Sequence, residues 1–148
     1  MIAGAGTAGR PPRERHVVFH DLGQATAALL AARPSGVRVV LRTARGAIAY
    51  AGPSYLLDLV RAAVATTASD PRTVEAALID CRDEPALAFA ALRTGWRGLI
   101  FAAAGAHRRE IEAAAAHYGA SLALRPPRAL DLAGHRDPAA ACRRWYRG

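Results

Sequence analysis

The alternation of short apolar runs with segments of helical spacing constrains the fold of this chain most. Strand-length apolar runs occur at residues 17–20, 37–42, 74–80, 96–101 and 120–124. Between and after them, helical spacing predicts helices at residues 24–32, 55–65, 85–93 and 107–117, with a short final helix capped by Asp137. Such alternation is typical of parallel strands joined by right-handed crossovers. The sequence therefore predicts an α/β fold with about five parallel strands.

The length of 148 residues predicts one α/β domain over residues 16–148. Residues 1–15 are rich in glycine, proline and arginine, and we expect them to form a flexible basic tail. Residues 4–9 match the pattern GxGxxG, but a dinucleotide-binding motif requires a strand before it and a helix after it. Neither fits here, so we interpret this match as chance.

All 20 basic residues are arginine, and the net charge is +8. The absence of lysine excludes Schiff-base chemistry by a lysine amine and the lysine of a phosphate-binding P-loop. The arginines are spread from Arg10 to Arg147 without a stripe of alternating basic and aromatic residues. We therefore interpret the charge as a solvated basic surface, with a nucleic-acid partner as the lesser alternative.

The composition, with 52% hydrophobic and 22% charged residues, is that of a globular protein. No apolar run reaches the roughly 18 residues that span a bilayer, so no membrane association is expected. The N-terminal residues lack the apolar stretch of a secretory signal. With only Cys81 and Cys142, a disulfide framework is not expected, and the sequence predicts a cytoplasmic protein.

Polar residues follow the predicted strands, at the edge where parallel α/β proteins place their chemistry. Asp80 ends one strand and fits a general base, or alternatively a helix cap or an acceptor of loop amides. Cys81 fits a metal ligand, or alternatively a small buried residue. His20 and His107, expected on the same edge, could complete a three-ligand metal site with Cys81, although their spacing matches no metal motif.

Arginines also stand at these strand ends. Arg42, Arg45 and Arg125 could hold an anion, because a guanidinium binds phosphate through two parallel hydrogen bonds. Exposed surface arginine is the alternative. Gly46 follows Arg45 directly and belongs to the same candidate ligand-binding loop.

Four motifs in the order expected for a known family carry a resemblance. The segment Gly-Ala-Ile-Ala-Tyr-Ala-Gly at residues 46–52 resembles the GAxxYxG element of class II fructose-bisphosphate aldolases and their tagatose relatives. Ile79-Asp80-Cys81 is similar to the strand that ends in Asp-His in that family, and the segment at residues 94–96 to its following glycine-aromatic pair. Phe19-His20 resembles the Phe-Asn pair at an early strand of that family. The resemblance spans residues 17–125.

The family is a metal-dependent (β/α)8 barrel, and this chain resembles only its first half. By this resemblance Asp80 takes the place of the aspartate of proton transfer, and Cys81 that of a zinc-binding histidine. A serine, an aspartate and an asparagine of the family are replaced by Ala44, Ala102 and His20. The other zinc ligands and the glycine-rich phosphate site lie in the missing half. The resemblance therefore implies a degenerate relative, folded as half a barrel or as an open flavodoxin-like sheet.

From these observations we expect a non-catalytic domain without a cofactor, which binds a small anionic or phosphorylated ligand. A half barrel leaves sheet edges exposed, so a homodimer is also expected. The alternative is a metal-dependent aldolase or lyase whose zinc site is completed across the dimer by Asp80, Cys81 and histidines.

Overall fold

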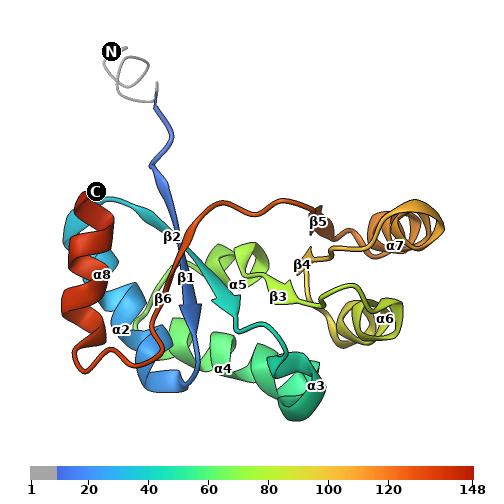
Figure 1. Cartoon of the computed structure of the whole chain (residues 1–148). Helices are drawn as coiled ribbons and strands as arrows, with labels where there is room; N and C mark the ends of the chain where they lie inside the picture. The colour runs from blue at the N-terminus through green and yellow to red at the C-terminus, as the bar shows by residue number, and fades with distance from the viewer. Residues whose placement is uncertain (1–9) are drawn as a thin grey trace.

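The computed structural model describes residues 10–148 (Figure 1). The strands are β1 (Glu14–Phe19), β2 (Arg38–Thr43), β3 (Ile79–Asp80), β4 (Gly98–Ile100), β5 (Ser121–Ala123) and β6 (Ala129–Asp131). The helices are α2 (Leu22–Ala32), the 3-10 turn η1 (Arg33–Ser35), α3 (Ala47–Ala51), α4 (Pro53–Thr66), α5 (Arg72–Ala76), α6 (Pro85–Thr94), α7 (Gly105–Tyr118) and α8 (Pro138–Arg147). The GxGxxG match lies outside the described residues.

All strand pairs are parallel, in two small sheets with the orders β2-β1-β6 and β3-β4-β5. A parallel bridge between Arg42 and Leu78 connects the sheets. There the amide of Thr43 donates to the carbonyl of Leu78 at 3.1 Å, and the amide of Leu78 donates to the carbonyl of Leu41 at 2.9 Å. The strands therefore follow one another as β6, β1, β2, β3, β4 and β5. In the described residues β5 does not pair with β6, and no barrel is closed.

Successive side chains along each strand lie on opposite faces of the sheet, and the two faces differ. One face packs against the helices and holds the main core, which includes Leu41, Ile79 and Leu99. The other, which we call the inner face, carries a small separate cluster of Val40, Leu78, Ile100 and Ala123. Residues 124–128, which we call the return segment, connect β5 back to β6 across the row of strands (Figure 1).

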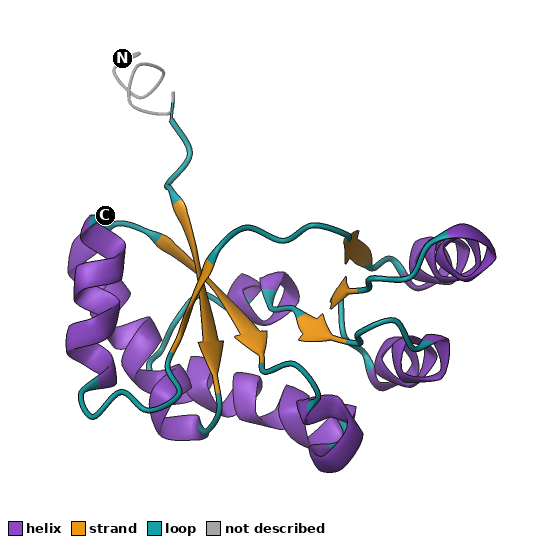
Figure 2. Cartoon of the chain, in the orientation of Figure 1, coloured by secondary structure: helices purple, strands orange, loops and turns teal. Residues whose placement is uncertain are grey.

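Capping residues define the ends of several helices. The side chain of Asp21 accepts from the amide of Gln24 at 2.7 Å and begins α2, and Asp137 does the same for Ala140 at 3.0 Å in α8. The helix α8 packs on α2 (Figure 2). There the buried hydroxyl of Tyr146 donates to the carbonyl of Ala28 at 2.7 Å. The last helix is therefore part of the core.

The α/β class and the parallel strands are confirmed, but several predicted elements differ. The first three residues of the strand predicted at 74–80 belong to the helix α5 instead, and only Ile79–Asp80 is strand. The side chain of Asp70 accepts from the amide of Arg72 at 2.9 Å and turns the chain into that helix. The helix α3 and the strand β6 were not predicted, and β1 begins at Glu14, within the segment expected to be a tail. None of the described helices has the length and apolar character to cross a membrane.

Candidate functional site

The carboxyl ends of the strands gather polar residues from several segments. His20 follows β1, Thr43 ends β2, and Asp80 and Asp131 end β3 and β6. Since all the strands are parallel and consecutive strands lie about 5 Å apart, these residues stand along one edge of the sheet. The predicted position of the site at this edge therefore has a physical basis in the fold.

Asp80 is half-buried and is engaged by the loops around it. Its amide donates to Oγ1 of the buried Thr43 at 3.0 Å, and its Oδ1 accepts from the amide of Arg82 at 2.9 Å. The carbonyl of Arg82 in turn accepts from the amide of Ala102 at 2.8 Å. Asp80 thus fixes the turn between β3 and α6, the role of a loop-amide acceptor that the sequence left open.

Cys81 lies on the opposite side of the sheet from Asp80, fully buried in the main core. Burial, together with the nearby charge of Asp80, raises the pKa of its thiol to about 12. Without a bound metal, a thiol with this pKa stays protonated at neutral pH. Within residues 10–148, His20 and His107 included, no three His, Cys, Asp or Glu side chains form a group that could hold a metal. The residues present do not fit a zinc site.

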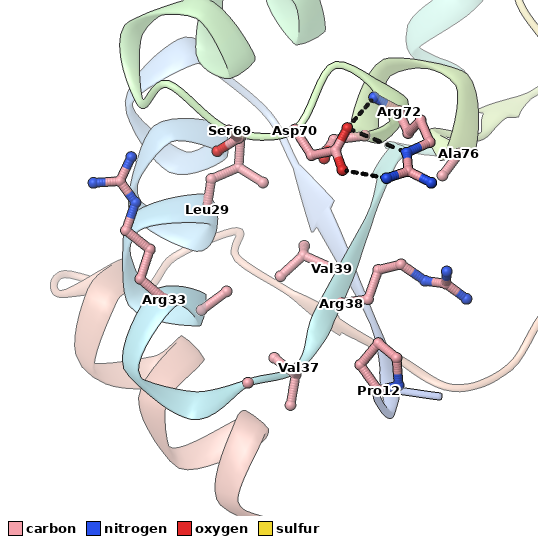
Figure 3. A pocket seen from close by; sticks show the side chains of 13 residues that line it. Pro12, Leu29, Arg33, Val37, Arg38, Val39, Ser69, Asp70, Arg72 and Ala76 are labelled. Carbon is pink, nitrogen blue, oxygen red and sulfur yellow. Dashed lines mark hydrogen bonds and ion pairs between the residues drawn. The ribbon is translucent and has the colours of Figure 1, made fainter. Parts of the chain in front are cut away.

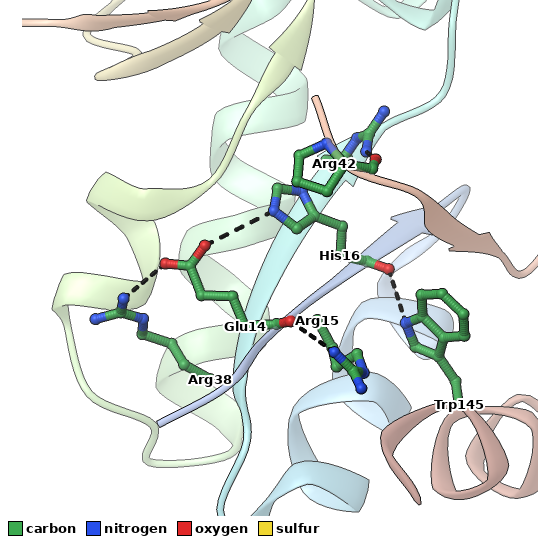
Figure 4. Close-up of polar contacts among 7 residues, drawn as sticks. Glu14, Arg15, His16, Arg38, Arg42 and Trp145 are labelled. Atoms are coloured by element: carbon green, nitrogen blue, oxygen red, sulfur yellow. Dashed lines mark hydrogen bonds and ion pairs between the residues drawn. The ribbon is translucent and has the colours of Figure 1, made fainter. Parts of the chain in front are cut away.

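Arg42 is the half-buried cation of the inner face. Its Nη1 donates to the carbonyl of Pro127 in the return segment at 2.7 Å, while its Nε is buried and has no hydrogen-bond partner (Figure 4). Burial lowers the pKa of Arg42, and the charge of Asp80 opposes this shift. The Nε donor of the guanidinium is therefore unused and shielded from solvent.

His16 lies beside Arg42 and is a site residue that the sequence did not suggest (Figure 4). It is 5% exposed, and its Nδ1 is buried without a partner. Its Nε2 lies 3.9 Å from Oε1 of Glu14. Burial and then the charge of Arg42 lower the pKa of His16, and Glu14 opposes them. Two shielded nitrogens without partners, His16 Nδ1 and Arg42 Nε, thus lie on the same face of β1 and β2.

The register of the strands explains this neighbourhood. Val40 pairs with His16, and Arg42 pairs with Val18, so His16 and Arg42 are diagonal neighbours on one face. One sequence signal for the placement of His16 on this face is the alternation along β1, which puts His16 and Val18 on the face opposite Val17 and Phe19.

Arg45 and Gly46 lie in the loop that leads into α3. Gly46 has a φ of 87°, a conformation that favours glycine, and it precedes the first residue of α3. Arg82 Nη1 comes within 3.8 Å of the position that a Cβ on Gly46 would occupy. Arg45 is exposed, and among the described residues no hydrogen bond or ion pair joins its side chain to Arg42 or Asp80. Arg125 is also exposed, in the return segment.

A second polar pair stands at the same edge. His20 Nε2 and Asp131 Oδ1 are 2.6 Å apart, and Asp131 also accepts from the amide of Ala133 at 2.9 Å. Partial burial acts to raise the pKa of Asp131, but these hydrogen bonds and the charges of His20 and His135 lower it overall. Asp131 was not predicted as a site residue, because the strand that carries it was not predicted.

A cavity of about 560 Å³ lies at the other end of the sheet (Figure 3). It is bounded by the start of β2, the end of α2 and the segment from Ser69 to Ala76. At its rim Arg72 pairs with Asp70 at 3.2 Å, and Arg38 pairs with Glu14 at 2.6 Å. None of the predicted site residues lines it.

No protein-family model matches this chain, and no curated protein matches it at a significant level. The arrangement of its own residues therefore carries any functional conclusion.

Proposed function

We propose that this chain is a non-catalytic binding domain that holds a small anion on its inner face, with Arg42 as the central ligand-binding group. One observation carries the proposal: Arg42 Nε and His16 Nδ1 are both buried and both lack a partner. Buried polar atoms are nearly always hydrogen-bonded, so such a pair calls for a bound group. A carboxylate or phosphate oxygen can accept from Arg42 Nε, and from His16 Nδ1 when the neutral ring carries its proton on that nitrogen.

Entry of the ligand requires the return segment to move. Both nitrogens are shielded from solvent, and Arg42 Nη1 is bonded to the carbonyl of Pro127. A ligand with two oxygens can replace that carbonyl as the partner of Nη1 while it accepts from Nε, because a guanidinium presents parallel donors to an anion. The exposed Arg45, in the loop that follows β2, adds positive charge at that end of the sheet.

The absence of catalysis is supported by the state of the residues that resemble aldolase positions. Cys81, at the place of a zinc-binding histidine, is a protonated thiol in the core. One oxygen of Asp80 is committed to the turn at Arg82. The order of β1 to β5 in space follows the order in sequence, as in the first half of a (β/α)8 barrel, which supports the resemblance.

Self-association is a further part of the proposal. The outer edges of β5 and β6 have no paired strand within the described part of the chain. Two copies could cover these edges with each other, as unpaired strand edges tend to do. Sedimentation equilibrium decides this point: a homodimer is expected, and a monomer at all concentrations tested contradicts it.

The ligand is tested by thermal unfolding with inorganic phosphate, a small phosphorylated sugar and a small dicarboxylate as probes. A ligand at 100 times its Kd stabilises the folded state by about 2.7 kcal/mol, which gives a clear rise in Tm. Arg42→Gln is expected to abolish this rise. The matched control Arg93→Gln, at an exposed position at the end of α6, is expected to keep it. If no probe stabilises the wild-type chain, the proposal is wrong.

A further inference from the structure

The net charge is concentrated in two segments at the ends of the chain. Residues 10–15 and 125–148 contain nine arginines and three carboxylates, a net charge of +6, whereas residues 16–124 contain eleven arginines and nine carboxylates, a net charge of +2. The spread of arginines from Arg10 to Arg147 is one of the two sequence features that favour a solvated surface over a nucleic-acid partner, the other being the lack of a basic-aromatic stripe. In the described structure the first feature no longer favours a solvated surface, because the two segments lie together.

Several contacts bring the two segments side by side. The guanidinium of Arg13 donates to the carbonyl of Tyr146 at 2.7 Å and to that of Gly148 at 3.5 Å, at the end of α8. Arg15 and Arg128 both stack on the ring of Trp145, with centroid distances of 5.7 and 5.6 Å. The indole of Trp145 donates to the carbonyl of His16 at 3.1 Å and fixes α8 against β1 (Figure 4).

The outer side of α8 extends this charged region. Cys142 and Tyr146 are buried against the rest of the fold, and Arg143, Arg144 and Arg147 are exposed. Arg143 and Arg144 precede Arg147 by four and three residues, so the three side chains lie on one face of the helix. With the arginines described above, they form what we call the terminal basic surface: Arg13, Arg15, Arg128, Arg143, Arg144 and Arg147.

Within residues 10–148, no aspartate or glutamate side chain forms an ion pair with an arginine of the terminal basic surface. The ion pairs that involve arginine in residues 10–148 are those of Arg38, Arg61, Arg72, Arg82 and Arg108, all outside this surface. The carboxylates in the two segments have other partners: Glu14 pairs with Arg38, Asp131 with His20, and Asp137 caps α8. The charge is therefore available to an external polyanion.

We infer that the terminal basic surface docks on the phosphate backbone of a nucleic acid. Guanidinium groups bind phosphate oxygens in pairs, and arginine is the only strong cation of this chain. An anionic membrane fits less well, because a helix that lies in a bilayer inserts an exposed apolar face. The apolar face of α8 is occupied by α2 and β1, and the exposed large apolar residues lie on other elements, at Leu22, Leu30, Tyr50, Tyr55 and Tyr118.

The inference is tested by the fluorescence anisotropy of a labelled short DNA duplex titrated with the full chain. Contacts to about five phosphates give a slope of log affinity against log salt of roughly −4 to −5. Between 50 and 200 mM salt the affinity is then expected to fall by about 300- to 1000-fold. Absence of binding at 50 mM salt overturns the inference.

Two double variants distinguish DNA binding by the terminal basic surface from attraction of DNA to the net positive charge of the whole chain. Arg143→Gln/Arg147→Gln is expected to weaken binding at least about tenfold at 50 mM salt and to make the slope shallower by about 2. The control Arg93→Gln/Arg109→Gln removes the same charge from exposed positions on α6 and α7 and is expected to have a much smaller effect. Equal losses in the two variants overturn the inference. So does binding to phosphatidylserine vesicles without binding to DNA, which would indicate a lipid partner. Arg42 does not belong to this surface, so the result is independent of the small-anion proposal.

Discussion

The carboxylate of Asp80 accepts a hydrogen bond from the amide of Arg82, 2.9 Å away, and Arg82 has a φ of 56°. A side chain other than glycine seldom adopts this conformation, which costs about 1 kcal/mol or more. The hydrogen bond from the Arg82 amide to Asp80 and the hydrogen bond from the Ala102 amide to the Arg82 carbonyl hold the residue there. The catalytic candidate of the sequence is thus also the residue that secures a strained turn.

Substitution of Asp80 is therefore expected to lower the stability of the fold. Asp80→Ala should lower the free energy of unfolding by about 1–2 kcal/mol, because the Arg82 amide loses its acceptor. Asp80→Asn keeps an acceptor oxygen and should cost less. Arg82→Gly relieves the strained φ and should recover up to about 1 kcal/mol in the Asp80→Ala background. Urea unfolding measures all three, and an Asp80→Ala variant as stable as the wild type contradicts this role.

His16 is expected to make folding sensitive to mildly acid pH. Its pKa in the folded protein is lowered by burial and by Arg42, so below its ordinary value near 6.5 the unfolded chain takes up a proton that the folded chain resists. This contribution to stability is complete above pH 6.5 and is lost as the pH falls toward the lowered pKa. Urea midpoints at several pH values between 7.5 and 5 measure it. His16→Leu should flatten the dependence in this range, and an unchanged slope in the variant would contradict it.

The elements that the sequence predicted well are those with long, regular spacing. The helices α4 and α7 repeat their apolar positions over several turns, and their predicted centres agree with the structure. The failures are short elements. The strand β6 has three residues and begins two positions after a proline pair, and α3 has five residues between two glycines. Both are too short to show a period. The segment at 74–80 is apolar enough for a strand, but the turn at Asp70 directs its first half into α5.

The candidate site was predictable in its position and only partly in its members. Parallel strands place their carboxyl ends at one edge, so Arg42 and Asp80 could be selected from the sequence. His16 could not, because its importance depends on the register that puts it diagonal to Arg42. The terminal basic surface depends likewise on the docking of α8 against β1. The positions of the arginines in the sequence indicate a dispersed charge, because they do not reveal which segments lie together in the fold.

Gly98 is expected to be intolerant of any side chain. A Cβ at this position would lie 2.7 Å from the carbonyl oxygen of Ala77 and 2.7 Å from Cδ2 of Leu78. The Ala77 carbonyl belongs to the backbone next to the bridge between the sheets, so it cannot shift without disturbing that bridge. Gly98→Ala should therefore lower the free energy of unfolding by about 1–3 kcal/mol, measured by thermal unfolding. Gly23→Ala is the control, because a Cβ there meets its nearest atom at 3.4 Å within a helix. In the same thermal unfolding measurement, Gly23→Ala should leave the free energy of unfolding unchanged or raise it by up to about 1 kcal/mol.

Cys81 is expected to be chemically inert in the folded protein. The thiol is fully buried, and its pKa of about 12 leaves almost no thiolate at neutral pH, although the thiolate is the reactive form. Cys142 is also fully buried, and burial raises the pKa of its thiol. A disulfide reagent at pH 7.5 should therefore release no chromophore from the native chain and two equivalents after unfolding in guanidinium. Prompt labelling of Cys81 in the native state would restore it as an available thiolate and remove one support for a non-catalytic domain.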